Sequence, residues 1–213
     1  VKYVAVAVIL SLLAMMLLLD SYAAPVIFMI SIGMAILYNM GTNIFLGEIS
    51  YITKAIAAVL QLGVTMDYSI FLWHSYMEKL DSGLDNHEAM GEAIDATLVS
   101  VTGSSATTIA GFLALCFMTY TMGKDLGIVM AKGVVFGVIS SVTVLPVLLL
   151  RFNKTLKRTR HKSLIPDMTK FAHGLTSRYG IYIAIFCILI IPAIYGYNHQ
   201  NVVYDFTKML SSG

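Results

Sequence analysis

An apolar run from about Ile49 to Trp73 constrains the fold of this chain more than any other feature. A membrane-spanning helix needs about 20 apolar residues, so this run is long enough to cross a bilayer. Asp67 lies well inside it, where a carboxylate costs about 2.5–3.5 kcal/mol to insert. A charge at that depth needs a polar partner, water or a bound proton. The run therefore predicts a membrane helix that carries an acid.

The Asp67 side chain has two interpretations. Burial away from water favours the neutral form of a carboxyl group, so Asp67 is expected to bind and release protons. Tyr68 follows it and offers a hydroxyl that can donate or accept a hydrogen bond. Alternatively, Asp67 is a structural residue that hydrogen-bonds to a neighbouring helix. Because ionisable residues inside membranes are by default functional, we favour a proton relay.

The rest of the chain predicts an all-α, polytopic transmembrane helix bundle. Of 213 residues, 58% are hydrophobic and only 12% are charged, whereas soluble domains are about 25% charged. Six apolar spans can be drawn, over residues 3–19, 25–45, 49–74, 101–118, 126–150 and 179–195. The polar stretch 78–95 predicts a surface helix that leads into the fourth span. Asp85 and Glu88 resemble a capping box at its start.

Small residues recur every four positions in two spans, which lets helix backbones approach closely in lipid. We expect helix-packing faces at Gly63, Gly103, Thr107, Gly111, Gly133 and Gly137. The fourth span also carries hydroxyl groups, including that of Ser104. One hydroxyl facing Asp67 would be enough to take part in a relay. Lys132 lies about two turns into the fifth span. We expect it to extend its amine to the nearer interface, with pairing to an acid as the alternative.

Charge predicts the orientation. Eight of the fourteen Lys and Arg residues fall between 151 and 178, and basic loops stay in the cytoplasm. We therefore expect three parts: a five-helix bundle (1–150), a basic cytoplasmic linker with an interfacial helix over 163–177 (151–178), and a last span with an extracytoplasmic stub (179–213). Turns at 20–24 and 77–98 would lie inside, and those at 47–51 and 119–125 outside. Because topology explains the basic run, no nucleic-acid partner is expected.

No motif indicates an enzyme. The sequence has no Gly-rich ATP loop, no zinc-ligand spacing and no nucleophile elbow. Cys116 and Cys187 lie in apolar runs and are expected to be small apolar fillers. We therefore expect no metal and no cofactor, and the bilayer and protons as partners.

Several segments resemble the MMPL-type transporters of the RND superfamily. Gly63-x-x-x-Asp67-Tyr68-x-Ile-Phe-Leu72, with Glu78, Gly83 and Glu88-Ala89, is similar to the fourth transmembrane helix of that family and the loop after it. Three further segments are similar to its fifth and sixth helices: Ser104-Ser-Ala-Thr107-Thr-Ile-Ala-Gly111, Asp125-Leu-Gly127 and Leu145-Pro146. The likeness is best over about residues 1–150.

The resemblance implies a twelve-span protein with two pseudo-symmetric halves, of which this chain holds helices two to seven. The chain begins at Val1 and is expected to be a fragment; 203–210 resembles the start of a second external domain. The implied function is export of lipids or hydrophobic compounds across the cell membrane, driven by inward proton flow. The implied relay is Asp67, Tyr68 and Ser104, with its partners in the missing second transmembrane half.

Three other functions stay open. A lipid- or sterol-sensing regulatory domain shares the five-helix block, but sensing needs no titratable acid. An export accessory resembling SecD or SecF is disfavoured by Tyr68 and by Phe71-Leu72. An ion channel needs pore-lining polar residues on several spans, and only the third and fourth spans offer them.

Overall fold

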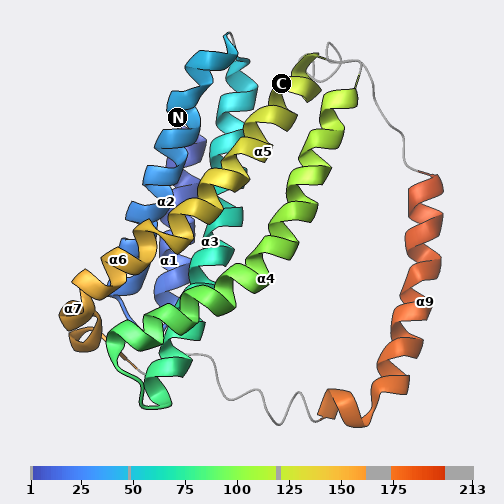
Figure 1. The fold of residues 1–213 in the computed structure, drawn as a ribbon. Coiled ribbons are helices and arrows are strands. Elements are labelled where there is room, and N and C mark those ends of the chain that lie inside the picture. The colour runs from blue at the N-terminus through green and yellow to red at the C-terminus, as the bar shows by residue number, and fades with distance from the viewer. Residues whose placement is uncertain (1, 48, 119–120, 162–173, 200–213) are drawn as a thin grey trace. The chain divides into compact units, whose positions relative to one another are not determined.

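The computed structural model describes residues 2–47, 49–118, 121–161 and 174–199, and its regular elements there are all helices (Figure 1). The chain divides into two compact units, 1–164 and 165–213. Five helical segments are long and apolar enough to cross a membrane: Ala23–Leu46, Tyr51–Asp81, Asn86–Phe117, Gly123–Arg151 and Tyr179–Asn198. The all-helical, multi-pass prediction is therefore confirmed. The first predicted span is the apolar helix α1 (Lys2–Leu18), which at 17 residues is shorter than these five.

Turn residues separate the first helices. Residues 19–22 connect α1 to α2 (Ala23–Gly41), and Pro25 lies in the first turn of α2, where a missing amide hydrogen costs little. The 3-10 helix η1 (Thr42–Leu46) continues α2. Gly47, at φ 79°, then ends the helical path, because a residue without a Cβ adopts positive φ most readily.

The next two helices, α3 (Tyr51–Asp81) and α4 (Asn86–Ala114), form a long hairpin. Gly83, at φ 97°, and Leu84 donate their amides to the carbonyls of Leu80 and Lys79. This pair of bonds is the Schellman arrangement that closes a helix end. Asp85 caps α4 by accepting from the His87 amide. The predicted surface helix and the fourth span are thus one continuous helix, which the 3-10 helix η2 (Leu115–Phe117) extends.

The fifth predicted span is interrupted. It consists of α5 (Thr121–Val142) and α6 (Val144–Arg151). Pro146 explains the break, because its ring has no amide hydrogen to donate to the carbonyl one turn earlier. The short helix α7 (Asn153–Arg158) follows and buries Leu156. Residues 151–161, predicted as part of a linker, therefore pack against the bundle.

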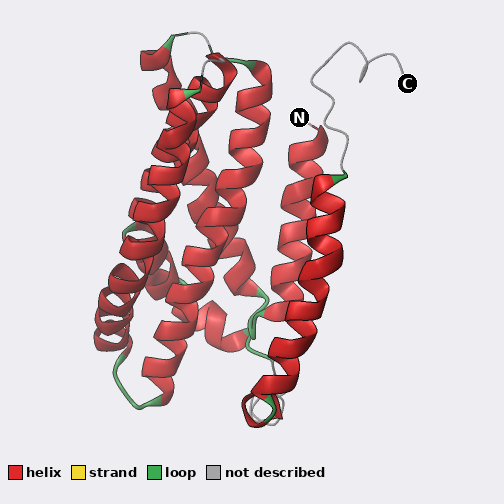
Figure 2. Cartoon of the chain, turned by 90° about the vertical axis from the view of Figure 1, so that its right-hand side faces the viewer, coloured by secondary structure: helices red, strands yellow, loops and turns green. Residues whose placement is uncertain are grey.

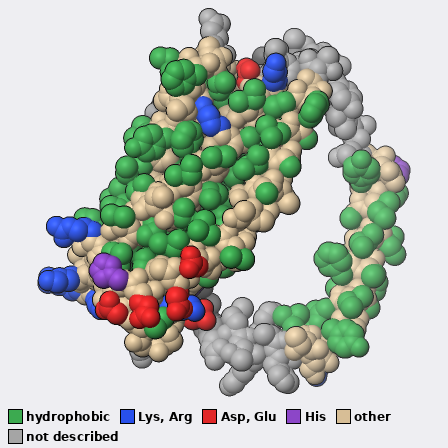
Figure 3. All heavy atoms as spheres, in the orientation of Figure 1, with side chains coloured by type: hydrophobic (Ala, Val, Ile, Leu, Met, Phe, Trp, Pro, Cys, Tyr) green, Lys and Arg blue, Asp and Glu red, His purple; other side chains and the backbone are tan. Residues whose placement is uncertain are grey.

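The first unit buries its core between the helices. The largest cluster joins α1, α2, α3, α4 and α6 and includes Phe28, Trp73, Tyr76 and Leu149. Helix α5 packs against α2, α3 and α4, and the helices run along a roughly common direction (Figure 2). On the face seen in Figure 3, hydrophobic side chains cover the middle, and acidic side chains gather at one end. Such a surface suits a bilayer-embedded bundle.

The second unit contains α9 (Tyr179–Asn198), which corresponds to the sixth predicted span. Most of the predicted interfacial helix over 163–177 lies outside the described residues, as does the predicted stub after residue 199.

Candidate functional site

Asp67 lies on the flank of α3 that faces α4. Its side chain is exposed and lines a groove of about 300 Å³ between the two helices. The walls of this groove are Val64, Tyr68 and Phe71 of α3 and Ser100, Val101, Ser104 and Thr108 of α4. Within the described part of the chain, none of the ion pairs includes the Asp67 carboxylate. The acid is thus available to a group outside the helices of the first unit.

Tyr68 is held much more firmly than Asp67. Its side chain is 6% exposed and packs with Val101 of α4 and Val134 of α5. Because successive residues on a helix point about 100° apart, the ring is anchored in the bundle while the neighbouring carboxylate faces the groove. Tyr68 therefore limits how α3 can rotate around Asp67.

Ser104 reaches the same groove from α4, so the three predicted relay residues line one cavity. Its hydroxyl lies 3.1 Å from the Val101 carbonyl of its own helix. Thr107 and Thr108 likewise donate to the Ser104 carbonyl, each at 2.8 Å. Such back-bonding satisfies a hydroxyl inside a membrane helix without a second helix. The groove thus has a hydroxyl-lined wall opposite the acid.

The predicted small-residue positions fall into two sets. Gly63, Gly103, Thr107 and Gly111 are exposed on the groove flank, and a Cβ added at any of the three glycines would meet nothing within 4 Å. Gly133 and Gly137 are buried on α5. A Cβ at Gly133 would lie 2.7 Å from Asn39 Nδ2, and one at Gly137 would lie 2.5 Å from Thr65 Oγ1. The second set therefore makes room for polar side chains of α2 and α3.

A polar stripe on the inward side of α3 was missed by the sequence reasoning. Thr53, Gln61, Thr65 and Ser69 are each at most 1% exposed. Asn39 of α2 donates its amide to Gln61 Oε1 at 2.7 Å and to the Val129 carbonyl of α5 at 3.2 Å. The four-residue spacing of Gln61, Thr65 and Ser69 within an apolar run was the signal that could have revealed it.

Several groups of this stripe, and of Asn39 on α2, are left without a hydrogen bond. Four buried atoms, Asn39 Oδ1, Thr53 Oγ1, Gln61 Nε2 and Thr65 Oγ1, have no partner in the described residues. A buried unpaired polar group costs about 1–3 kcal/mol. The interface of α3 with α2 and α5 is therefore polar but incompletely satisfied.

Lys132 of α5 extends to the neighbouring end of the bundle. Its amine donates to Asn43 Oδ1 on η1, a neutral partner near the helix end. This contact agrees with the expected direction of the side chain and gives Lys132 no role in the groove.

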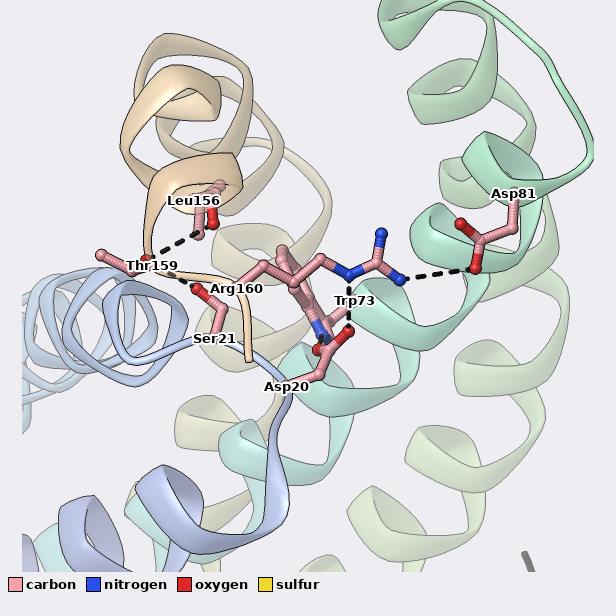
Figure 4. A network of polar contacts seen from close by, with 7 residues as sticks. All are labelled: Asp20, Ser21, Trp73, Asp81, Leu156, Thr159 and Arg160. Atoms are coloured by element: carbon pink, nitrogen blue, oxygen red, sulfur yellow. Dashed lines mark hydrogen bonds and ion pairs between the residues drawn. The ribbon is translucent and has the colours of Figure 1, made fainter. Parts of the chain in front are cut away.

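A second network at the opposite end joins three distant segments (Figure 4). Trp73 Nε1 donates to Asp20 Oδ1 at 2.9 Å, and Arg160 contacts Asp20 at 3.4 Å and Asp81 at 3.5 Å. The amide of His161 donates to the Asp20 carbonyl at 2.8 Å. These contacts, here called the Arg160 clasp, hold the segment after α7 against the α1–α2 turn and the end of α3. Because Asp20 and Arg160 are far apart in sequence, spacing offered no signal for them.

One protein family matches most of the chain. The MMPL family profile matches residues 1–171. ActII-3 of Streptomyces coelicolor is 34% identical over 179 residues, which cover 78% of this chain and 24% of that protein. Membrane protein YdfJ of Bacillus subtilis is 22% identical over 141 residues, 66% of this chain and 19% of YdfJ.

A relative that is named for its function matches a shorter stretch of the chain. The trehalose monomycolate exporter MmpL3 of Mycobacterium tuberculosis is 26% identical over 117 residues, which cover 54% of this chain and 12% of MmpL3. The chain thus matches at most about a quarter of the length of these relatives. No solved structure matches it significantly.

Proposed function

This chain belongs to the MMPL family of membrane transporters, and from that premise we propose that it is part of an exporter driven by the proton motive force. The cargo is a lipid or another hydrophobic compound, moved across the cytoplasmic membrane. The observation that carries the proposal is the Asp67 carboxylate, which faces an open, hydroxyl-lined groove within a membrane-spanning helix. The naming of the relative MmpL3 as an exporter supports the direction of transport.

The groove supports a protonation cycle. A charged Asp67 requires a polar partner or water, whereas a protonated Asp67 can face an apolar surface at far lower cost. Each protonation state therefore favours a different packing of the α3 and α4 surface beside the groove. A proton gradient that alternates the two states would move this surface back and forth. Tyr68 and Ser104 supply hydroxyls at the positions where the proton enters or leaves.

A second membrane half of the same protein is the partner that we propose for this flank. Gly63, Gly103, Thr107 and Gly111 form a surface of small residues beside Asp67, and such surfaces let another helix approach closely in lipid. A polar group on that helix would then meet the charged carboxylate.

Proton uptake into liposomes with an imposed pH gradient tests the proposal. We expect the intact wild-type protein to take up protons and Asp67→Asn to insert normally but lose the flux, because an amide cannot release a proton. Glu78→Gln is the matched control, since Glu78 is an exposed acid on the same helix outside the groove. Equal flux in wild type and Asp67→Asn, or none in either, would instead favour a lipid-sensing domain.

A further inference from the structure

On its inward side, α3 packs against α2 and α5. The contacts between α2 and α5 differ in their hydrogen bonding from those that α3 makes with them. Ser31 of α2 and Ser140 of α5 pair at 2.9 Å between their hydroxyls, and Ser140 also donates to the Ser31 carbonyl at 2.9 Å. Asn39 of α2 donates to the Val129 carbonyl of α5. Helices α2 and α5 are therefore tied together by satisfied hydrogen bonds. The contacts of α3 with this pair are the ones that remain incomplete.

The unused atoms of Asn39 and Gln61 are complementary hydrogen-bonding groups. The bond from Asn39 Nδ2 to the Val129 carbonyl determines which way the Asn39 amide points, because a carbonyl accepts only from a donor. In this orientation Gln61 uses its oxygen towards Asn39, and the pair leaves one acceptor, Asn39 Oδ1, and one donor, Gln61 Nε2, unused. Because one is an acceptor and the other a donor, a bond between these two atoms is a second arrangement that the chemistry of the pair allows. The amide pair thus has two complementary arrangements.

Helix α5 presents backbone to Gln61 and Thr65, while its Val134 packs against Tyr68 of α3. Gly133 lies against the Asn39–Gln61 pair and Gly137 lies against Thr65, so no α5 side chain at these positions interlocks with α3. Packed helices that move relative to each other do so by small sliding shifts. A backbone surface opposite Gln61 and Thr65 is suited to that motion, whereas interdigitated side chains would hinder it.

We propose that the interface of α3 with the α2–α5 pair is a sliding contact, in which Gln61 exchanges its hydrogen bond to Asn39 as Asp67 changes its charge. Gln61 is then a positioning residue for Asp67, six residues along the same helix. The inference rests on the proposed function, because Asp67 supplies the change that displaces α3. Tyr68 is the titratable group beside Asp67 in the groove, and the α4 residues that line it contribute hydroxyls and no charge.

A disulfide between α3 and α5 tests the sliding contact directly. A Cβ at position 137 would lie 3.5 Å from Thr65 Cβ, which is within the usual range for a disulfide of about 3.5–4.5 Å. We would introduce Thr65→Cys and Gly137→Cys into the intact protein, with its native cysteines, Cys116 and Cys187 among them, replaced by Ser. The matched control is Ser31→Cys with Ser140→Cys, which links α2 to α5 at a contact that should not move.

We expect oxidation of the 65–137 pair to reduce proton flux about tenfold or more, reductant to restore it, and oxidation of the 31–140 pair to leave it unchanged. Flux that is unaffected by the 65–137 disulfide would overturn the proposal. Cross-linking yield provides a readout that needs no transport. The yield of the 65–137 cross-link should differ between the wild-type background and Asp67→Asn. Equal yields would overturn the sliding contact even if no proton flux is found. Unequal yields without proton flux would contradict only the proposed function.

The amide pair can be tested without a cross-link. Asn39→Leu together with Gln61→Met removes both polar partners at similar volume, so thermal stability should be kept or increased. We expect flux to fall about tenfold or more in this double variant despite its stability. If the pair were merely structural, the double variant would lose thermal stability and keep its proton flux. Wild-type flux in the stable double variant would overturn the role of Gln61.

Discussion

Asp67 and Gln61 lie on one helix but face different surroundings. Asp67 lines the groove beside α4, whereas Gln61 is 1% exposed and bonds to Asn39 of α2. Both are polar groups within a span long enough to cross the membrane, where polar side chains are costly and tend to be functional. The acid was predicted from its residue type and depth. The amide was not, because a neutral side chain attracts less notice in an apolar run.

Gly133 allows a prediction at this scale. Gly133→Ala should destabilise the purified protein by about 1–3 kcal/mol, because the added Cβ would lie 2.7 Å from Asn39 Nδ2 and 3.2 Å from Gln61 Oε1. Thermal unfolding in detergent measures the change. Gly33→Ala is the control, since a Cβ there meets nothing within 4 Å, and it should be neutral or stabilise by up to about 1 kcal/mol. Equal melting temperatures for the two variants would contradict the close contact.

At the scale of elements, local signals predicted some helix boundaries and missed others. Asp85 caps α4 as its capping pattern predicted, whereas α3 continues past the predicted end at residue 74 to Asp81, where Gly83 closes it. The break between α5 and α6 was not predicted, although Pro146 was visible in the sequence. A proline inside a membrane span does not by itself reveal whether neighbouring helices will tolerate a kink.

Asp85 makes the start of α4 sensitive to acid. Hydrogen bonds from the Asn86 and His87 amides lower the pKa of Asp85. Its capping contribution should therefore be complete above the ordinary aspartate range, about pH 4, and lost as the pH falls through the lowered pKa. Hydrogen exchange of the first turn of α4 should accelerate over that acidic window. Asp85→Ala should show fast exchange already at neutral pH, whereas Asp85→Ser, which can still cap, should remain protected; equal rates in both would contradict the cap.

At the scale of the whole molecule, the predicted orientation can be tested by labelling. Tyr51, in the turn predicted to lie outside, is 73% exposed, and Lys154 is exposed on α7. In a background whose native cysteines, Cys116 and Cys187 among them, are replaced by Ser, Tyr51→Cys should react with an impermeant thiol reagent added outside intact cells. Lys154→Cys should react only after the membrane is opened, because basic segments stay in the cytoplasm. The reverse pattern would invert the topology, and the direction of proton flow through the groove with it.

Hydropathy and local spacing were sufficient to predict an all-helical membrane protein and the acid within its third span, and the resemblance of several segments to known transporters indicated the family. These properties depend on residue type and on positions a few residues apart, which are the quantities that a sequence contains. Tertiary structure decided which face of α3 carries Asp67 outward, which glycines are packed, and that Asn39 meets Gln61. It also decided the Arg160 clasp, whose residues Asp20 and Arg160 meet only when α7 folds back. Such contacts arise from the packing of distant helices, so no pattern along the chain encodes them locally.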